Sequence, residues 1–142
     1  MRLTKRSWSI NLAVTAATRS EEFHKVGAVV CRADGVVLGV GYNGPPPGVD
    51  LEATSRDERR PYVIHAEANA LRLTTPQDAT GGWLATSMHP CAECIKLAAA
   101  YGITEINWKH ELDWSVYDRA AIQLVAFRTG VRLIPDQGVT YA

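Results

Sequence analysis

The sequence predicts an α/β protein, a three-layer α/β/α arrangement in which helices cover a five-stranded mixed sheet. Short runs of β-branched and apolar residues alternate with helical segments, which is typical of a sheet with helices on its faces. A helical segment separates the last two strands, so the crossover rule makes those two strands parallel. The length of 142 residues indicates one domain, residues 1–142.

A helix followed by a β-hairpin is predicted at the start of the chain. Residues 6–18 place Trp8 and Leu12 on one helical face. Val26–Cys31 and Val36–Val40 are apolar runs joined by a segment that contains Asp-Gly, a strong hairpin signal. We therefore expect the first two strands to be antiparallel.

A proline-rich loop follows the hairpin. The prolines between Gly41 and Gly48 exclude a helix or a central strand there. Residues 49–60 are charged and aperiodic, so we expect them on the surface without regular structure.

Helices and strands alternate in the rest of the chain. The last helix is the longest, and its apolar side is predicted to carry Val116, Ala120, Leu124 and Phe127. The helices are expected at 65–73, 91–101 and 115–129, and the strands at 83–86, 103–108 and 131–134.

Charge and hydropathy exclude several classes of protein. Fifteen basic residues balance fifteen acidic ones, which argues against a protein that grips long nucleic acid but not against one that binds a mononucleotide. No apolar segment approaches the about 18 residues of a membrane span, and polar residues interrupt the N-terminal helix, so we expect neither a membrane segment nor a signal peptide.

Cysteine usage favours a reducing compartment. The chain has three cysteines, Cys31, Cys91 and Cys94, and the last two form a C-x-x-C pair. An odd number with this spacing is unlike the disulfide framework of a secreted protein. We therefore expect a cytoplasmic protein.

Two short motifs carry the chemistry: His65-Ala66-Glu67 and Pro90-Cys91-Ala92-Glu93-Cys94. Each stands at the start of a predicted helix, and the two thiols, three residues apart, share one helix face. One imidazole and two thiolates leave the fourth tetrahedral position of a zinc ion open, as a hydrolytic site needs. Glu67 is then free for proton transfer. H-x-E with P-C-x-x-C is a signature of zinc-dependent nucleobase deaminases.

Other interpretations of these residues stay open at this point. A C-x-x-C pair is often a redox pair or half of a structural zinc site, which needs four protein ligands. The candidate fourth ligands are Cys31, His24, His89 and His110, of which Cys31 lies in a predicted strand and is more typical of a small buried apolar group.

Further segments accompany the zinc motif, namely Arg19-Ser20, Val26 to Val29, Gly41-Tyr42-Asn43-Gly44, Tyr62 to Ala70 and Pro90 to Cys94. With them, nearly the whole chain resembles the deoxycytidylate (dCMP) deaminase branch of the cytidine deaminase-like superfamily. The superfamily shares the zinc motif, whereas Gly-Tyr-Asn-Gly together with His-Ala-Glu-x-Asn-Ala indicates the dCMP branch. The resemblance implies the cytidine deaminase-like fold.

The resemblance also implies a zinc-dependent hydrolase that converts dCMP to dUMP and ammonia and supplies dUMP for thymidylate synthesis. One catalytic Zn²⁺ per subunit is expected, and Glu67 is expected to move protons while water attacks C4 of cytosine. The implied metal ligands are His65, Cys91 and Cys94. The implied substrate contacts are the backbone of Ala66 and Pro90 around the base, Asn43 at the deoxyribose or phosphate, and Arg19 with Ser20 at the 5′-phosphate.

Many members of the family are hexamers that dCTP activates and dTTP inhibits, so a homo-oligomer and these effectors are expectations here. His89 departs from the pattern, because relatives often carry a small or hydroxyl-bearing residue at this position. Two alternative functions remain: a deaminase of another nucleobase substrate (modified dCMP, a nucleoside or a tRNA adenosine), and a non-catalytic zinc-binding module.

Overall fold

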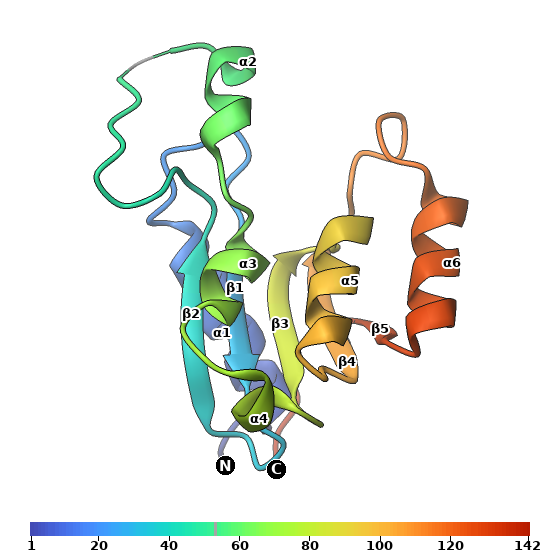
Figure 1. Cartoon of the computed structure of the whole chain (residues 1–142). Helices are drawn as coiled ribbons and strands as arrows, with labels where there is room; N and C mark the ends of the chain where they lie inside the picture. Colours follow the sequence, from blue (N-terminus) through green and yellow to red (C-terminus); the bar gives the residue numbers. More distant parts are fainter. Residues whose placement is uncertain (53) are drawn as a thin grey trace.

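The computed structural model describes residues 1–52 and 54–142, and it contains one five-stranded sheet in the order β2-β1-β3-β4-β5 (Figure 1). The strands are β1 (Gly27–Cys31), β2 (Val37–Tyr42), β3 (Trp83–Met88), β4 (Glu105–His110) and β5 (Arg132–Pro135). The helices are α1 (Lys5–Ala17), α2 (Arg56–Arg59), η1 (Arg60–Tyr62), α3 (Ala66–Leu71), α4 (Pro76–Ala79), α5 (Ala92–Ala100) and α6 (Arg119–Thr129).

The sheet is mixed, as the sequence predicts. β1 pairs antiparallel with β2 on one side and with β3 on the other. β3, β4 and β5 are parallel neighbours, so the predicted parallel pairing of the last two strands is confirmed. Parallel strands end at the same edge of a sheet, which brings the segments after β3 and β4 together.

Helices cover both faces of the sheet and confirm the three-layer α/β/α class. α1 packs on one face, where Ile10 and Ala13 bury Val29, Cys31 and related side chains. α3 and α5 lie side by side on the opposite face (Figure 1). Alternate residues of β1 therefore enter two different apolar clusters, because successive side chains of a strand point to opposite faces.

Two helices bury a different face from the predicted one. In α6, Ile122 and Ala126 are buried, whereas Leu124 and Phe127 are 50% and 83% exposed. In α1, Ile10 and Ala13 are buried and Trp8 is 43% exposed. Both helices carry apolar residues on more than one side. The buried side of α1 is the one that packs against the sheet, and the buried side of α6 is the one that packs against α5.

Some elements differ from the predicted ones in extent. The last helix begins at Arg119 instead of residue 115, because the segment before it forms a turn closed by Asp113. The segment expected to lack regular structure forms α2 and η1. Within α2, Ser55 accepts a hydrogen bond from the Glu58 backbone at 3.2 Å, a capping interaction of the Ser-x-x-Glu type. Among the described residues, no helix combines the length and apolar character that a bilayer crossing requires.

Candidate active site

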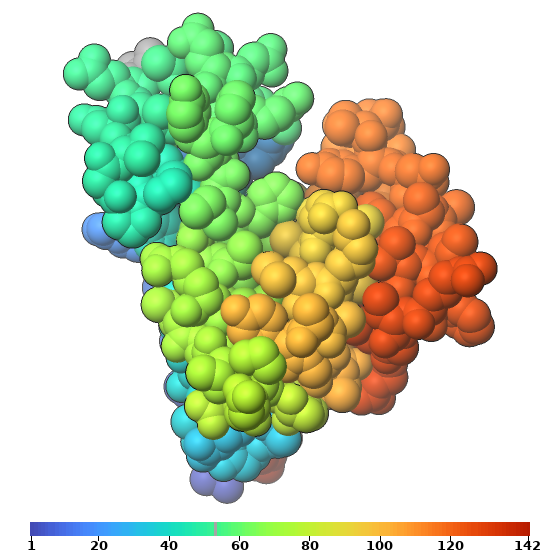
Figure 2. All heavy atoms as spheres, in the orientation of Figure 1, coloured from blue at the N-terminus to red at the C-terminus, as the bar shows by residue number. Residues whose placement is uncertain are grey.

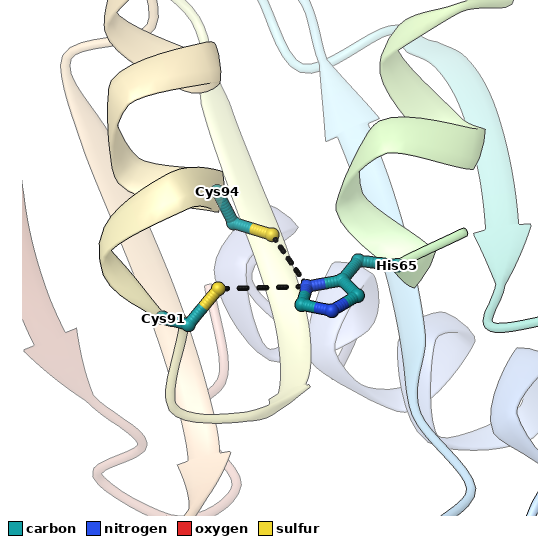
Figure 3. A group of neighbouring side chains, drawn as sticks. All are labelled: His65, Cys91 and Cys94. Atoms are coloured by element: carbon teal, nitrogen blue, oxygen red, sulfur yellow. Dashed lines mark hydrogen bonds between the residues drawn. The ribbon is translucent and has the colours of Figure 1, made fainter. Parts of the chain in front are cut away.

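Two helix N-termini carry the predicted metal ligands. His65 is the N-cap residue of α3, and Cys91 is the N-cap residue of α5. Both have extended backbone conformations, and neither side chain caps its own helix, so both remain available to a ligand. Cys94 lies one turn into α5, on the same side as Cys91. Figure 3 shows the three side chains pointing toward one another across the gap between α3 and α5.

The spacing of these three side chains fits a zinc ion. His65 Nδ1 lies 3.3 Å from Cys94 Sγ and 3.5 Å from Cys91 Sγ (dashed lines in Figure 3). Tetrahedral zinc, bonded at about 2.3 Å to sulfur and about 2.0 Å to nitrogen, places such atoms about 3.5 Å apart. Within the described part of the chain, no fourth His, Cys, Asp or Glu completes the group. The set therefore suits one zinc with an open position, not a four-ligand structural site.

Electrostatics at the site favour a thiolate even before metal binds. The hydrogen bond from Cys94 is the largest effect that lowers the pKa of the Cys91 thiol to about 4, and His65 lowers it further. The same cluster raises the pKa of His65, mainly through its hydrogen bond with Cys91. The acidic Cys91 thiol is therefore suited to a divalent cation, which would take the place of its proton.

Glu67 stands next to the metal ligands but outside the metal-binding group. It is the second residue of α3, 4% exposed, and it lines the cavity described below. Burial raises the pKa of its carboxyl, and a hydrogen bond with Cys94 opposes that effect. A carboxyl with a raised pKa exchanges protons more readily near neutral pH than an ordinary one, which suits a general acid and base.

A cavity of about 700 Å³ opens in front of His65, Glu67 and Cys91. One of its walls is the segment of α2 and η1, and the opposite wall is the segment that follows β4. Figure 2 shows a hollow between these walls, with α2 in green and residues 111–118 in orange. The remaining lining residues are Glu22, Phe23, His24, Val26, Asn43, Arg56, Arg60, Val63, Ala66, Met88, His89, Glu111, Leu112, Asp113, Val116 and Tyr117.

Two of the predicted substrate contacts, Asn43 and Ala66, lie on this cavity. The Asn43 side chain is also part of the wall itself. Its Oδ1 accepts a hydrogen bond from the Val26 backbone at 2.9 Å, and its Nδ2 donates to the His24 carbonyl at 2.7 Å. These bonds fix the segment of His24 and Val26 against the end of β2.

The other three predicted contacts lie elsewhere among the described residues. Ser20 is buried, and its hydroxyl donates to the Asn43 carbonyl at 2.9 Å and accepts from the Glu22 backbone. Pro90 is fully buried behind the cavity surface. Arg19 is exposed at the end of α1 and does not line the cavity. The structure therefore brings Asn43 and Ala66 to the cavity with the metal ligands, but not Arg19.

Close packing of α3 on β2 places His65 and Glu67. A Cβ on Gly41 would lie 2.5 Å from the Ala70 nitrogen, so only glycine allows this approach. Asn69 donates to the Tyr42 carbonyl at 2.9 Å. Backbone hydrogen bonds between Gly44 and Ile64 then hold the residue just before His65. The two family segments, Gly-Tyr-Asn-Gly and His-Ala-Glu-x-Asn-Ala, are thus one packed unit.

His89 forms part of the cavity wall beside Cys91. It is 7% exposed, and its Nδ1–H donates to the Pro90 carbonyl at 2.9 Å. Its ring packs at 4.8 Å from Trp108 and edge-on at 5.0 Å from Trp114. Burial lowers its pKa. The residue is therefore a fixed, uncharged wall held by two aromatic rings.

Several residues that line the cavity were not predicted from the sequence as site residues. Arg56 and Arg60 were part of a segment read only as charged surface, although the Ser55-x-x-Glu58 capping pattern signals the short helix that presents them. Tyr117 and its neighbours were assigned to the last helix instead of the cavity wall. Val116 continues the helical spacing of apolar residues in the following segment, so the sequence carries no signal that the helix begins later.

Comparison with known proteins gives the chain its family. Residues 3–109 match the model of the cytidine and deoxycytidylate deaminase zinc-binding region. The human deoxycytidylate deaminase is 33% identical over 129 residues, covering 84% of this chain and 72% of that protein. The deoxycytidylate deaminase of Mycobacterium phage D29 is 36% identical over 118 residues, covering 72% of this chain and 91% of that protein.

A solved structure agrees with this relationship. The dCMP deaminase of the cyanophage S-TIM5, in complex with dCMP and dUMP, superposes with a TM-score of 0.71. It is 28% identical, and the match covers 89% of this chain and 93% of that one. With a metal-binding group of the expected composition and a family model that spans three quarters of the sequence, the chain belongs to the cytidine and deoxycytidylate deaminase family.

Proposed function

We propose that this chain is a zinc-dependent hydrolase that converts dCMP and water to dUMP and ammonia. The observation that carries the proposal is the three-residue metal group with a separate buried carboxyl, Glu67, beside it on one cavity. The deoxycytidylate deaminases among its relatives support dCMP as the substrate. We take residues 1–142 as a single catalytic domain.

His65, Cys91 and Cys94 would hold the ion, which when bound supplies a Lewis acid that makes water nucleophilic near neutral pH. Glu67 accepts the proton that water loses and delivers it to N3 of cytosine as oxygen bonds to C4. It then carries the second proton, from the new hydroxyl on C4, to the amino group, so that the C4–N bond breaks, the C4 carbonyl forms and ammonia leaves. The burial that raises the pKa of Glu67 matches both the accepting and the donating role.

The cavity surface suits a pyrimidine nucleotide. Ala66 and His89 line the cavity next to the metal group, where we place the base, and Pro90 is buried behind that surface. Asn43 also lines the cavity, and we place the sugar beside it. We retain Ser20 as a support of Asn43, since its hydroxyl donates to the Asn43 carbonyl.

We further propose a cytoplasmic homo-oligomer. All three cysteines are free, as a reducing compartment allows. Leu124 and Phe127 expose large apolar side chains on α6, which a neighbouring subunit would cover. Hexamers and control by dCTP and dTTP are expectations from the family. Sedimentation with and without these nucleotides tests them, and a monomer under all conditions contradicts the oligomer.

A deamination panel tests the proposed activity. The zinc-loaded protein is offered dCMP, CMP, deoxycytidine, cytidine, 5-methyl-dCMP and a tRNA anticodon stem, and base absorbance and ammonia are followed. We expect deamination of dCMP well above that of deoxycytidine or CMP. Preference for a free nucleoside, or for adenosine in tRNA, contradicts the proposal in favour of another deaminase. No turnover of any substrate by the zinc-loaded protein favours a non-catalytic zinc module.

A further inference from the structure

Two arginines line the cavity and take no part in the proposed reaction. Arg56 begins α2 and Arg60 begins η1, so the two are four residues apart on consecutive helical turns and lie on one face. Both belong to the cavity lining, together with Glu67 and His65 at its inner end. The metal group and two guanidinium groups therefore line the same cavity.

Both guanidinium groups are largely without protein partners. Within the described residues, Arg56 makes no ion pair and its side chain makes no hydrogen bond. Arg60 approaches only Asp57, at 3.8 Å, and that carboxylate is 88% exposed. Such an exposed contact contributes little and yields readily to a better ligand. The donors of these two arginines are therefore available to an anion in the cavity.

The arginine between them has the opposite character and fixes the wall. Arg59 forms a two-pronged ion pair with Glu22, at 2.8 and 2.6 Å, and both side chains are at most 8% exposed. Arg59 also donates to the Leu51 carbonyl. A bidentate pair of this kind fixes orientation as well as position. It locks α2 to the segment after α1 and so aims Arg56 and Arg60 at the cavity.

Apart from Glu67, the acidic residues on the cavity are already engaged by the protein. Glu22 is bound by Arg59, and Glu111 accepts a hydrogen bond from Trp114 Nε1 at 2.8 Å. Hydrogen bonds from Ser115 are the main cause of the lowered pKa of Asp113. The charges of His24 and Arg56 add to that lowering.

We propose that Arg56 and Arg60 form the binding site for the 5′-phosphate of the substrate and thereby select a nucleoside monophosphate over the free nucleoside. The inference rests on the proposed function, because it places the base at the metal group. A guanidinium binds phosphate with two parallel hydrogen bonds, so two arginines provide strong and directional recognition. The site replaces Arg19, which lies outside the cavity.

The test compares two substrates that differ only in the phosphate. Arg56→Gln, Arg60→Gln and the double variant are assayed with dCMP and with deoxycytidine. A lost charge-assisted hydrogen bond corresponds to about 10- to 100-fold in kcat/KM, so we expect each single variant to lose that much with dCMP, chiefly through KM. Deoxycytidine should change by less than about 2-fold, because it makes no such bond.

Arg19→Gln is the matched control, since it removes the same charge from the end of α1, and we expect it to act on dCMP like the unaltered protein. Equal losses with both substrates, unchanged dCMP kinetics in the double variant, or a dCMP-selective loss in Arg19→Gln would each overturn the assignment. Zinc content and Tm measured on every variant separate a lost contact from a lost fold.

A binding experiment separates this proposal from the proposed activity. Titration calorimetry with dUMP and with deoxyuridine reports the phosphate contact without any turnover. If the unaltered protein fails to deaminate dCMP, the activity is wrong. The phosphate site is still supported if the unaltered protein binds dUMP and the double variant binds dUMP at least 10-fold more weakly. The assignment of the phosphate site is wrong if the double variant binds dUMP as tightly as the unaltered protein.

Discussion

The inner and outer ends of the cavity are built in different ways. At the inner end, four functional side chains come from two short motifs, each fixed to the N-terminus of a helix. At the outer end, the lining comes from α2, η1 and the segment after β4, which are distant in sequence and face each other across solvent. The inner end is thus rigid and specified locally, whereas the outer end depends on long-range contacts such as the pair of Glu22 and Arg59.

Loss of a metal ligand should have the largest effect. In Cys91→Ala we expect zinc to be lost and deamination to fall below detection, because two remaining ligands hold zinc weakly. Metal analysis and ammonia release measure both. Cys31→Ala is the control: Cys31 is buried in β1 against α1, on the other face of the sheet, and its removal should keep one zinc per chain. A fully active, zinc-free Cys91→Ala protein would contradict the metal assignment.

Loss of the proposed proton carrier should have the second-largest effect. Glu67→Gln keeps the size of the side chain but cannot take a proton, so we expect kcat to fall by about 10²- to 10⁴-fold while zinc stays bound. Rapid-quench assays with dCMP and parallel metal analysis measure this. Activity within a few-fold of the unaltered protein would show that another group moves the proton.

Breaking the buried ion pair should weaken the outer end. Glu22→Gln leaves Arg59 buried without its counter-charge, and we expect Tm to fall by roughly 10 °C. Since α2 then loses its anchor, KM for dCMP should rise more than kcat falls. Glu21→Gln, on the exposed neighbouring residue, serves as the control and should leave both unchanged. If Glu22→Gln lowers kcat alone, the outer wall does not depend on this pair.

The smallest effect should come from the junction that supports the inner end. Gly41→Ala forces a Cβ against the Ala70 backbone, and we expect a loss of about 1–3 kcal/mol in the free energy of unfolding. Gly44→Ala meets nothing within 4 Å and should stay within about 0.5 kcal/mol. Urea unfolding of the two variants measures the difference. Equal stabilities would mean that α3 shifts on β2 at little cost.

The sequence alone was sufficient for the inner end because its chemistry is local. Cys91 and Cys94 share a face by helical spacing, and Pro90 is typical of a helix start. The hairpin and the parallel pairing of the last strands also follow from short-range rules. Only the proximity of His65 to the two cysteines depends on the tertiary structure. The presence of both motifs in one chain already predicted that proximity.

Helical periodicity was ambiguous where a helix carries apolar residues on two sides. In α6, Leu124 and Phe127 form one spaced set and Ile122 and Ala126 another. Which set is buried depends on the shape that α5 offers. Because periodicity measures only spacing, it identified the helix but not its buried side.

The sequence by itself predicted the sheet class, the grouping of three metal-binding side chains and the proposed proton carrier, because those depend on residue types at fixed short spacings. Tertiary structure decided which charged residues line the cavity. Arginines are common on surfaces, and residue type does not distinguish Arg19 from Arg56 or Arg60. A buried ion pair between Arg59 and Glu22, 37 residues apart, turns one segment toward the cavity. Such a contact exists only once the chain is folded.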